Sequence, residues 1–380
     1  MRRALVLLAS ALISFGCVYE FTPEIDPVDS VGLVVEGDIV IGDVSTFTLT
    51  AVEPLSSPLS ARTPLNGKAW VEDDQGNQYL PEKSGSASSF SIDMTGAPLD
   101  REYRLRVILD TPITAGTGSY SSEFKPVQQA PSIDELTYTY DNSDVHLWLS
   151  LSSPGGSGCF RWDYEEIWEY HADSLASYYF DVTDGRVKSY DGAIPPLYWC
   201  WMYKNSTQAG LAIAKSTGGE RISGYKFLDF GRMEKRTQKL YYIKLKARGI
   251  SEECYEYLHA IEVNSTSTGS LTQPDPSRIV GNIRSDDNPL EVVYGYIEVA
   301  KMATRSMYID DKYVFIPQPK AGGDVHPPEP ISGPITYWEL YEGGSRPFNA
   351  PNVWLSYKCV ECTAEGGVKI KPDFWPTDTE

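Results

Sequence analysis

Apolar and polar residues alternate with a period of two along much of the chain, most clearly over residues 160–170. This is the period of a β-strand whose two faces meet different surroundings. One face carries Phe160, Trp162, Tyr164, Trp168 and Tyr170, and the other carries Arg161, Asp163, Glu165 and Glu169. We expect the aromatic face in the core and the charged face in water. Glu166 is the exception on the aromatic face, where burial would require a partner or a raised pKa.

The same alternation recurs over residues 31–128. It marks the segments 46–52, 89–94 and 103–109. Residues 68–80 hold two β-rich runs separated by an Asp/Gly/Asn cluster, which is the pattern of a hairpin. Turn signals follow one another roughly every 10–20 residues, a spacing typical of a small sandwich. Residues 31–128 are therefore predicted to form an immunoglobulin-like β-sandwich.

A proline-containing stretch at residues 126–131 separates this unit from residues 129–380, a larger β-rich domain. One helix is predicted within it, from Ser251 to about Val263, because Ser251 suits an N-cap and apolar residues recur behind it at helical spacing. Residues 317–334 are rich in proline and glycine and predict a long loop. The predicted fold class is mainly β: an N-terminal immunoglobulin-like sandwich followed by a larger β-rich domain with one or two short helices.

The first residues have the pattern of a bacterial lipoprotein signal peptide. Two arginines precede an apolar run, and Gly16 stands directly before Cys17. We therefore expect residues 1–16 to be removed and Cys17 to carry the lipid anchor, followed by an acidic, proline-containing tether over residues 17–30. The alternative is ordinary cleavage nearby, with Cys17 left as a thiol. No later segment is apolar for the roughly 18 residues that a membrane span needs.

The 380 residues carry a formal charge of −19, which makes the chain a poor general binder of nucleic acid. Against this background, residues 232–248 hold seven basic residues and one acidic residue. This segment could contact lipid phosphate or an acidic partner, or form a solvated hairpin. Aromatic residues make up 12% of the chain, which supports the assignment to strands.

Five cysteines follow Cys17: Cys159, Cys200, Cys254, Cys359 and Cys362. A secreted protein meets an oxidising environment, so disulfides are permitted. The spacing of Cys359 and Cys362 makes them the candidate disulfide, with free thiols as the alternative. A zinc site would need four ligands, and no second Cys-x-x-Cys is present, so no metal is predicted.

No catalytic motif stands out, and no catalytic residue or cofactor is predicted. Glu166 is the best candidate for an unusual acid if the protein were a carboxylate-dependent hydrolase, although a buried structural glutamate explains it as well. The aromatic stretch 198–203 is the most unusual in the chain. As a strand it would place Trp199, Trp201 and Tyr203 on one face. That face could be a platform for a ligand or a protein interface. The alternative is a strand that is buried on both sides.

Several motifs resemble a family of Bacteroidota outer-membrane lipoproteins of unknown function, often encoded beside TonB-dependent receptors. The motifs are Arg161-Trp162-Asp163-Tyr164-Glu165-Glu166, Cys200-Trp201, Gly281-Asn282-Ile283 and Cys359-x-x-Cys362 with Lys371-Pro372-Asp373-Phe374-Trp375 downstream. The resemblance implies an outer-membrane lipoprotein and brings no catalytic residues. In the family pattern a cysteine follows the Gly-Asn-Ile motif. This sequence has Arg284-Ser285 there, which leaves the pairing of Cys200 open.

Three functions follow as hypotheses. The first is a non-enzymatic lipoprotein, anchored in the outer membrane through Cys17 and facing outward, that acts as the accessory or ligand-capture subunit of a TonB-dependent transporter. The resemblance carries the transporter part of this expectation. The second is a stand-alone glycan- or peptide-binding lipoprotein that uses the Trp199/Trp201 face. The third is the hydrolase with Glu166.

Overall fold

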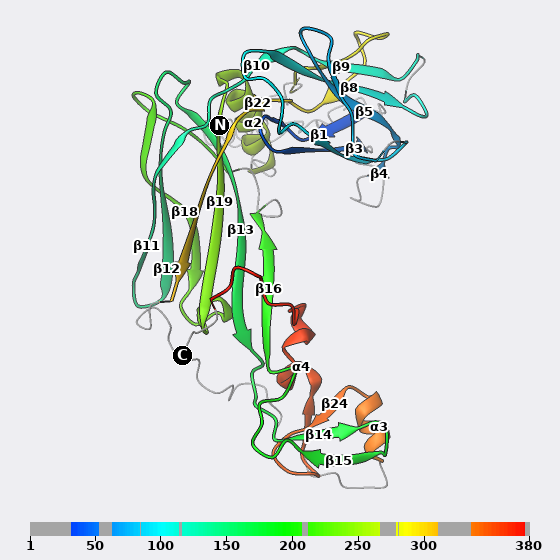
Figure 1. Ribbon diagram of the computed structural model, residues 1–380, viewed down its shortest axis with the longest axis vertical. Helices are drawn as coiled ribbons and strands as arrows, with labels where there is room; N and C mark the ends of the chain where they lie inside the picture. The colour runs from blue at the N-terminus through cyan, green and yellow to red at the C-terminus, as the bar shows by residue number, and fades with distance from the viewer. Residues whose placement is uncertain are drawn as a thin grey trace, which may run out of the picture.

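The computed structural model describes residues 32–52, 63–83, 85–113, 116–206, 212–266, 279, 281–310 and 336–376. The predicted signal peptide, Cys17, the predicted acidic tether and the predicted loop 317–334 lie outside the described residues. Two β-sandwiches and a small lobe follow one another along the long axis of the molecule (Figure 1). The mainly β fold class is confirmed.

The first sandwich consists of two sheets that enclose one core. One sheet has the order β21 (Val293–Tyr294), β1 (Gly32–Glu36), β3 (Val44–Val52), β4 (Thr63–Pro64), with β7 (Ser89–Asp93) also on β3. The other has the order β20 (Ile283–Ser285), β9 (Ser119–Ser122), β8 (Glu102–Leu109), β5 (Gly67–Asp73), β6 (Gln78–Tyr79), with β10 (Lys125–Pro126) on β8. The alternation predicted along β8 is confirmed, since Tyr103, Leu105 and Val107 are buried in this core.

Two strands of the first sandwich come from far along the chain. β21 pairs in parallel with β1, and β20 pairs antiparallel with β9. Ile283 and Val293 thereby enter the core of the first sandwich. The chain therefore returns to the first sandwich after it has formed most of the second.

The second sandwich packs a three-stranded sheet against a larger one. The first sheet has the order β11 (Ser132–Tyr140), β12 (Asp144–Ser152), β18 (Arg221–Gly231). The second has the order β16 (Trp199–Asn205), β13 (Cys159–His171), β19 (Leu240–Ile250), β23 (Met302–Ile309), with β17 (Ile213–Lys215) also on β13. The aromatic face of β13 fills the core between the sheets, as predicted; Trp162, for example, meets Tyr225 of β18 edge to face at 5.1 Å.

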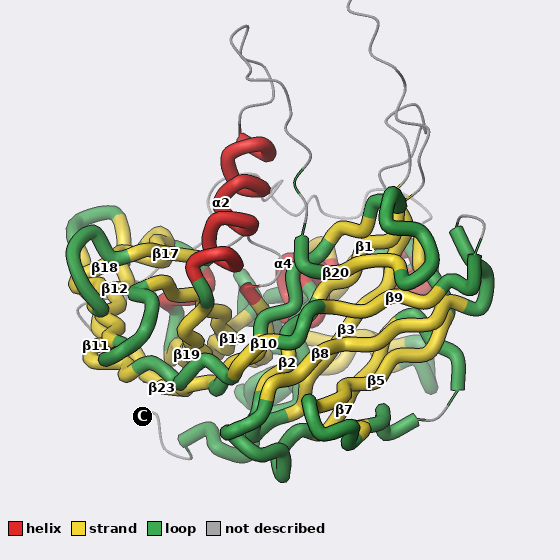
Figure 2. The backbone as a smooth tube through the Cα atoms, turned by 90° about the horizontal axis from the view of Figure 1, so that it is seen from above, coloured by secondary structure: helices red, strands yellow, loops and turns green. Residues whose placement is uncertain are grey.

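Helix α2 (Glu252–Thr266) confirms the helix predicted from Ser251. It stands beside the junction of the sandwiches, where Figure 2 shows it between the two groups of strands. Cys254 and Leu258 pack against Cys159 of β13 and its neighbours. The short parallel pair of β2 (Ile39–Val40) and β22 (Val299–Ala300) lies at the same junction. None of the helices in the described part of the chain is long and apolar enough to cross a membrane.

The small lobe lies at the opposite end of the molecule from the first sandwich (Figure 1). It contains two hairpins, β14 (Tyr178–Asp181) with β15 (Arg186–Ser189) and β24 (Ser345–Pro347) with β25 (Trp354–Ser356), and two short helices, α3 (Tyr337–Glu342) and α4 (Tyr357–Val360). Phe180 is at the centre of the lobe, with the rings of Trp338 and Tyr341 at 5.0 and 5.2 Å.

Candidate binding surface

The aromatic residues of β16 lie on the outer face of the larger sheet, away from the sandwich core. Cys200 of the same strand is buried in the core and Met202 packs against it, so the predicted alternation is confirmed. Trp199 and Trp201 are half-buried, whereas Tyr203 is 46% exposed. Of the three aromatic side chains, only that of Tyr203 is largely open to a ligand.

The C-terminal strap, defined here as residues 367–376, crosses this outer face. Trp201 and Val368 exchange two backbone hydrogen bonds of 2.9 Å, which add a single antiparallel bridge to the edge of β16. Further along, the Tyr203 hydroxyl donates to the carbonyl of Ile370 at 3.2 Å. The strap therefore covers part of the face that the sequence pattern leaves open.

Trp375 anchors the far end of the strap. Its side chain is 3% exposed and packs against Ile167, Leu240 and Tyr242. Its indole Nε1 donates to Glu169 Oε2 at 3.0 Å, and Lys239 Nζ lies 3.0 Å from the other carboxylate oxygen of Glu169. The expectation that Glu169 faces water is wrong, because the strap closes over this end of the sheet and supplies the carboxylate with donors.

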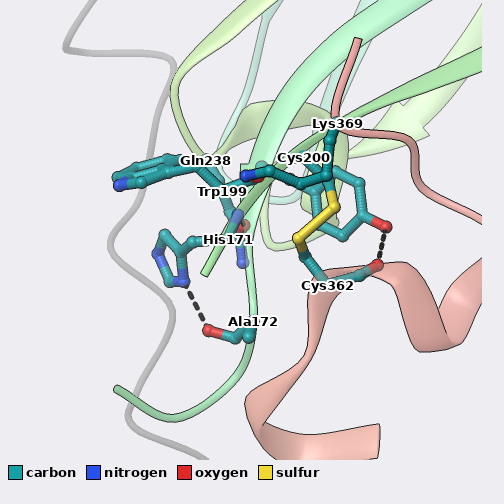
Figure 3. Close-up of a disulfide and its surroundings, with 8 residues drawn as sticks. His171, Ala172, Trp199, Cys200, Gln238, Cys362 and Lys369 are labelled. Atoms are coloured by element: carbon teal, nitrogen blue, oxygen red, sulfur yellow. Dashed lines mark hydrogen bonds between the residues drawn. A yellow bond between two sulfur atoms is a disulfide. The ribbon is translucent and has the colours of Figure 1, made fainter. Parts of the chain in front are cut away.

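The structure places the disulfide between Cys200 and Cys362, with an S–S distance of 2.07 Å (Figure 3). The predicted Cys359–Cys362 disulfide is wrong, and Cys359 is free and half-buried. The hydroxyl of Tyr170 donates to the carbonyl of Cys362 at 2.5 Å and holds this turn against the sheet. Cys362 therefore faces β16 rather than its neighbour in sequence, and no cysteine after the Gly-Asn-Ile motif is needed.

Gly367 allows the strap to pass close to the sheet directly after the disulfide. A Cβ atom at this position would lie 2.2 Å from Tyr170 Oη and 2.9 Å from Cys200 Cβ. Any side chain here would push the strap away from β16. The sequence motif around Cys362 thus contains the residues that fix the course of the strap.

The small lobe displays apolar side chains that the sequence analysis missed. Helix α3 begins with a capping box, in which Thr336 and Glu339 satisfy each other's backbone amides. The ring of Trp338 packs edge to face on Phe180 but is 44% exposed, and Tyr337 stacks on Trp354 at 5.5 Å. The Thr-x-x-Glu pattern in the sequence could have revealed this helix. No local sequence pattern indicates that its aromatic residues are exposed.

Glu166 is part of a buried ion pair. Its carboxylate lies 3.1 Å from Arg236 Nε and accepts a hydrogen bond of 2.9 Å from Tyr241 Oη. Burial raises the pKa of Glu166, and Arg236 and Tyr241 oppose that rise. The guanidinium of Arg236 also lies 5.2 Å from the centre of the Trp168 ring. Because the side chain is fully enclosed, the carboxylate is not positioned to meet a substrate.

The positive charge of residues 232–248 is largely neutralised within the fold. Lys235 pairs with Glu365 at 2.6 Å, Arg236 with Glu166, and Lys239 with Glu169. Two further ion pairs join neighbouring strands of the larger sheet: Lys246 with Glu165 and Arg248 with Asp163. These cations are engaged inside the protein rather than displayed together. Within the described residues, no group of three or more metal-ligating side chains comes together.

Comparison with known proteins gives a family but no activity. No curated protein matches the sequence. Among solved structures, a two-domain fibronectin type-III segment from chicken tenascin aligns with 73% of this chain and 97% of its own length, at 7% identity and a TM-score of 0.16. The model of the domain of unknown function DUF4249 matches residues 18–306. Because this match spans most of the chain, the protein belongs to the DUF4249 family.

Proposed function

We propose that this protein is a non-catalytic, outward-facing outer-membrane lipoprotein that serves a TonB-dependent transporter as an accessory subunit or by capturing its ligand. The observation that carries the proposal is the concentration of exposed apolar side chains at the end of the molecule remote from the N-terminal sandwich. Large exposed apolar surfaces are typical of protein or ligand contacts.

Ten of the nineteen large apolar residues that are exposed in the described chain belong to the small lobe or to the surface around the strap. In the lobe they are Leu175, Val182, Ile194, Tyr337 and Trp338. Around the strap they are Tyr203, Tyr308, Val368, Ile370 and Phe374. About half of the exposed large apolar residues of the described chain therefore belong to these two adjoining regions.

The position of the proposed anchor at Cys17 relative to the small lobe is consistent with a lobe that contacts a partner. Gly32 is 15 positions after Cys17. A fully extended chain spans at most about 3.3–3.6 Å per residue, so Gly32 would lie within roughly 50 Å of the membrane surface. The small lobe lies at the opposite end of the long axis from the sandwich that begins at Gly32 (Figure 1). An anchor at Cys17 would therefore attach at the end of the molecule away from the lobe and leave the apolar residues of the lobe uncovered.

Binding explains the site residues better than hydrolysis does. Glu166, the best residue for the hydrolase hypothesis, is enclosed with Arg236 and Tyr241. The second candidate function is a stand-alone glycan- or peptide-binding lipoprotein. The exposed ring of Tyr203 beside the strap favours it, although Trp201 is partly covered.

The test is purification of the protein from native outer membranes in mild detergent, followed by mass spectrometry of what is recovered with it. We expect a TonB-dependent barrel in a stoichiometric amount, and less of it with Trp338→Ala. Leu290→Ala is the matched control, because Leu290 is an apolar residue of the first sandwich that is 86% exposed. Recovery of the lipoprotein alone would favour the stand-alone binding protein.

A further inference from the structure

We propose that the surface formed by the strap and the outer side of β16 binds an oligosaccharide that carries carboxylate groups, an inference that rests on the ligand-capture role proposed above. Its apolar part consists of Tyr203, Ile370 and Phe374, which are 46%, 75% and 53% exposed. Exposed aromatic rings provide flat apolar surfaces on which the faces of sugar rings can pack.

These rings are held in place before any ligand arrives. Phe374 packs on Tyr242 with the ring centres 4.8 Å apart. The hydroxyl of Tyr308 donates to the Phe374 carbonyl at 3.1 Å, and that of Tyr203 donates to the Ile370 carbonyl at 3.2 Å. The tyrosine hydroxyls are thus used inside the protein, and the exposed area belongs to the rings. A rigid surface loses little conformational entropy on binding.

The strap also adds positive charge beside the rings. Lys369 Nζ donates to the carbonyl of Trp199, and Lys371 Nζ donates to the carbonyl of Pro376 at 2.9 Å. Among the described residues, neither ammonium group forms an ion pair, whereas Lys239 and Lys246 of the same sheet are paired with glutamates. Two ammonium charges therefore remain available to a carboxylate on the ligand.

One carboxylate stands close to this surface. Asp373 is exposed and directly precedes Phe374, and its negative charge adds to the rise that burial causes in the pKa of Tyr203. With Lys369 and Lys371 the strap still carries a net charge of +1. A ligand carboxylate would therefore be attracted to the lysines and repelled by Asp373.

The charge of the whole chain narrows the ligand class. At −19, the protein repels long polyanions and anionic membranes at a distance. At physiological ionic strength the Debye length is about 8 Å, so a short oligosaccharide responds mainly to the charges next to it. An acidic peptide would satisfy the lysines without offering flat rings to Tyr203 and Phe374. A carboxylated oligosaccharide uses both features.

The experiment is calorimetric titration of the full lipidated chain in detergent with three probes: an oligogalacturonate, neutral maltoheptaose and poly-glutamate. We expect the oligogalacturonate to bind several-fold more tightly than either of the others, and its affinity to fall as salt is added. Equal binding of maltoheptaose would overturn the role of the lysines. Equal binding of poly-glutamate would overturn the role of the rings. Absence of oligogalacturonate binding, or affinity that rises with salt, would overturn the proposal as a whole.

Variants separate the two contributions. Tyr203→Ala should weaken binding about 2- to 10-fold, while Tyr203→Phe, which keeps the ring and loses only the hydrogen bond to Ile370, should weaken it less. Changing both Lys369 and Lys371 to alanine should cost up to about 5-fold at low salt, and Asp373→Asn should strengthen binding. Lys83→Ala, an exposed lysine of the first sandwich, is the control. Recovery of a barrel from native membranes does not depend on these titrations, so failure here leaves the proposed function standing.

Discussion

Arg248 of β19 lies 2.8 Å from Asp38, a residue between β1 and β2 of the other sandwich. Both side chains are 5% exposed, and Arg248 also contacts Asp163 at 2.8 Å. Arg161 reaches Asp38 as well, at 3.1 Å. Burial alone would raise the pKa of Asp163, but the charges of Arg248 and Arg161 outweigh it and leave that pKa lowered. The junction of the sandwiches is therefore closed by a buried network of ion pairs.

Removal of one partner should destabilise this junction. In Arg248→Met, Asp38 and Asp163 lose a buried guanidinium, and we expect a loss of about 3–5 kcal/mol in the free energy of unfolding. Urea denaturation would measure it. Lys188→Ala, which removes an exposed pair with Asp181, is the control and should change stability little. A loss no larger than that of the control would show that the pair does not hold the junction.

The disulfide between Cys200 and Cys362 closes a loop with a sequence separation of 162 residues. Cys200→Ser should lower stability by roughly 2–5 kcal/mol, because a crosslink over a long loop restricts the unfolded chain. Cys359→Ser should have little effect. Peptide mapping without reduction should recover Cys200 joined to Cys362. Recovery of Cys359 joined to Cys362 would contradict the pairing.

Glu166 should make stability depend on pH in a definite direction. Its pKa in the folded protein is raised above the ordinary value of 4.5, mainly by burial. The folded state then holds the proton more tightly than the unfolded state, so the contribution to stability is full below pH 4.5 and is lost as pH rises through the folded pKa. The free energy of unfolding should be measured for the wild type and for Glu166→Gln from pH 4 upward. The difference, wild type minus variant, should decrease as pH rises. An increase would mean that Arg236 dominates and lowers the pKa.

Trp375 should hold the strap on the sheet. In Trp375→Ala the strap loses its buried anchor and Glu169 loses a donor, so the amides of Trp201 and Val368 should exchange hydrogen faster. Phe374→Ala is the matched control, because Phe374 is 53% exposed and its loss should disturb these amides less. Hydrogen exchange measured by mass spectrometry distinguishes the two. Equal effects would show that Trp375 is not the anchor.

Local patterns determined the elements of this protein. The alternation of residues 160–170 predicts both β13 and its buried aromatic face, because the direction of a side chain on a strand depends only on its position. The helix from Ser251 follows from an N-cap and helical spacing in the same way. The exception at Glu166 was also visible, and the structure supplies the Arg236 partner that its burial requires.

Only the tertiary structure decided what covers each face and which distant residues meet. The pattern of β13 cannot show that Trp375 buries Glu169, because the two are 206 residues apart. Nor can spacing show that Cys362 pairs with Cys200, or that β20 and β21 return to the first sandwich. Periodicity records the direction of a side chain from its own backbone. The partner it meets there depends on where the rest of the chain packs.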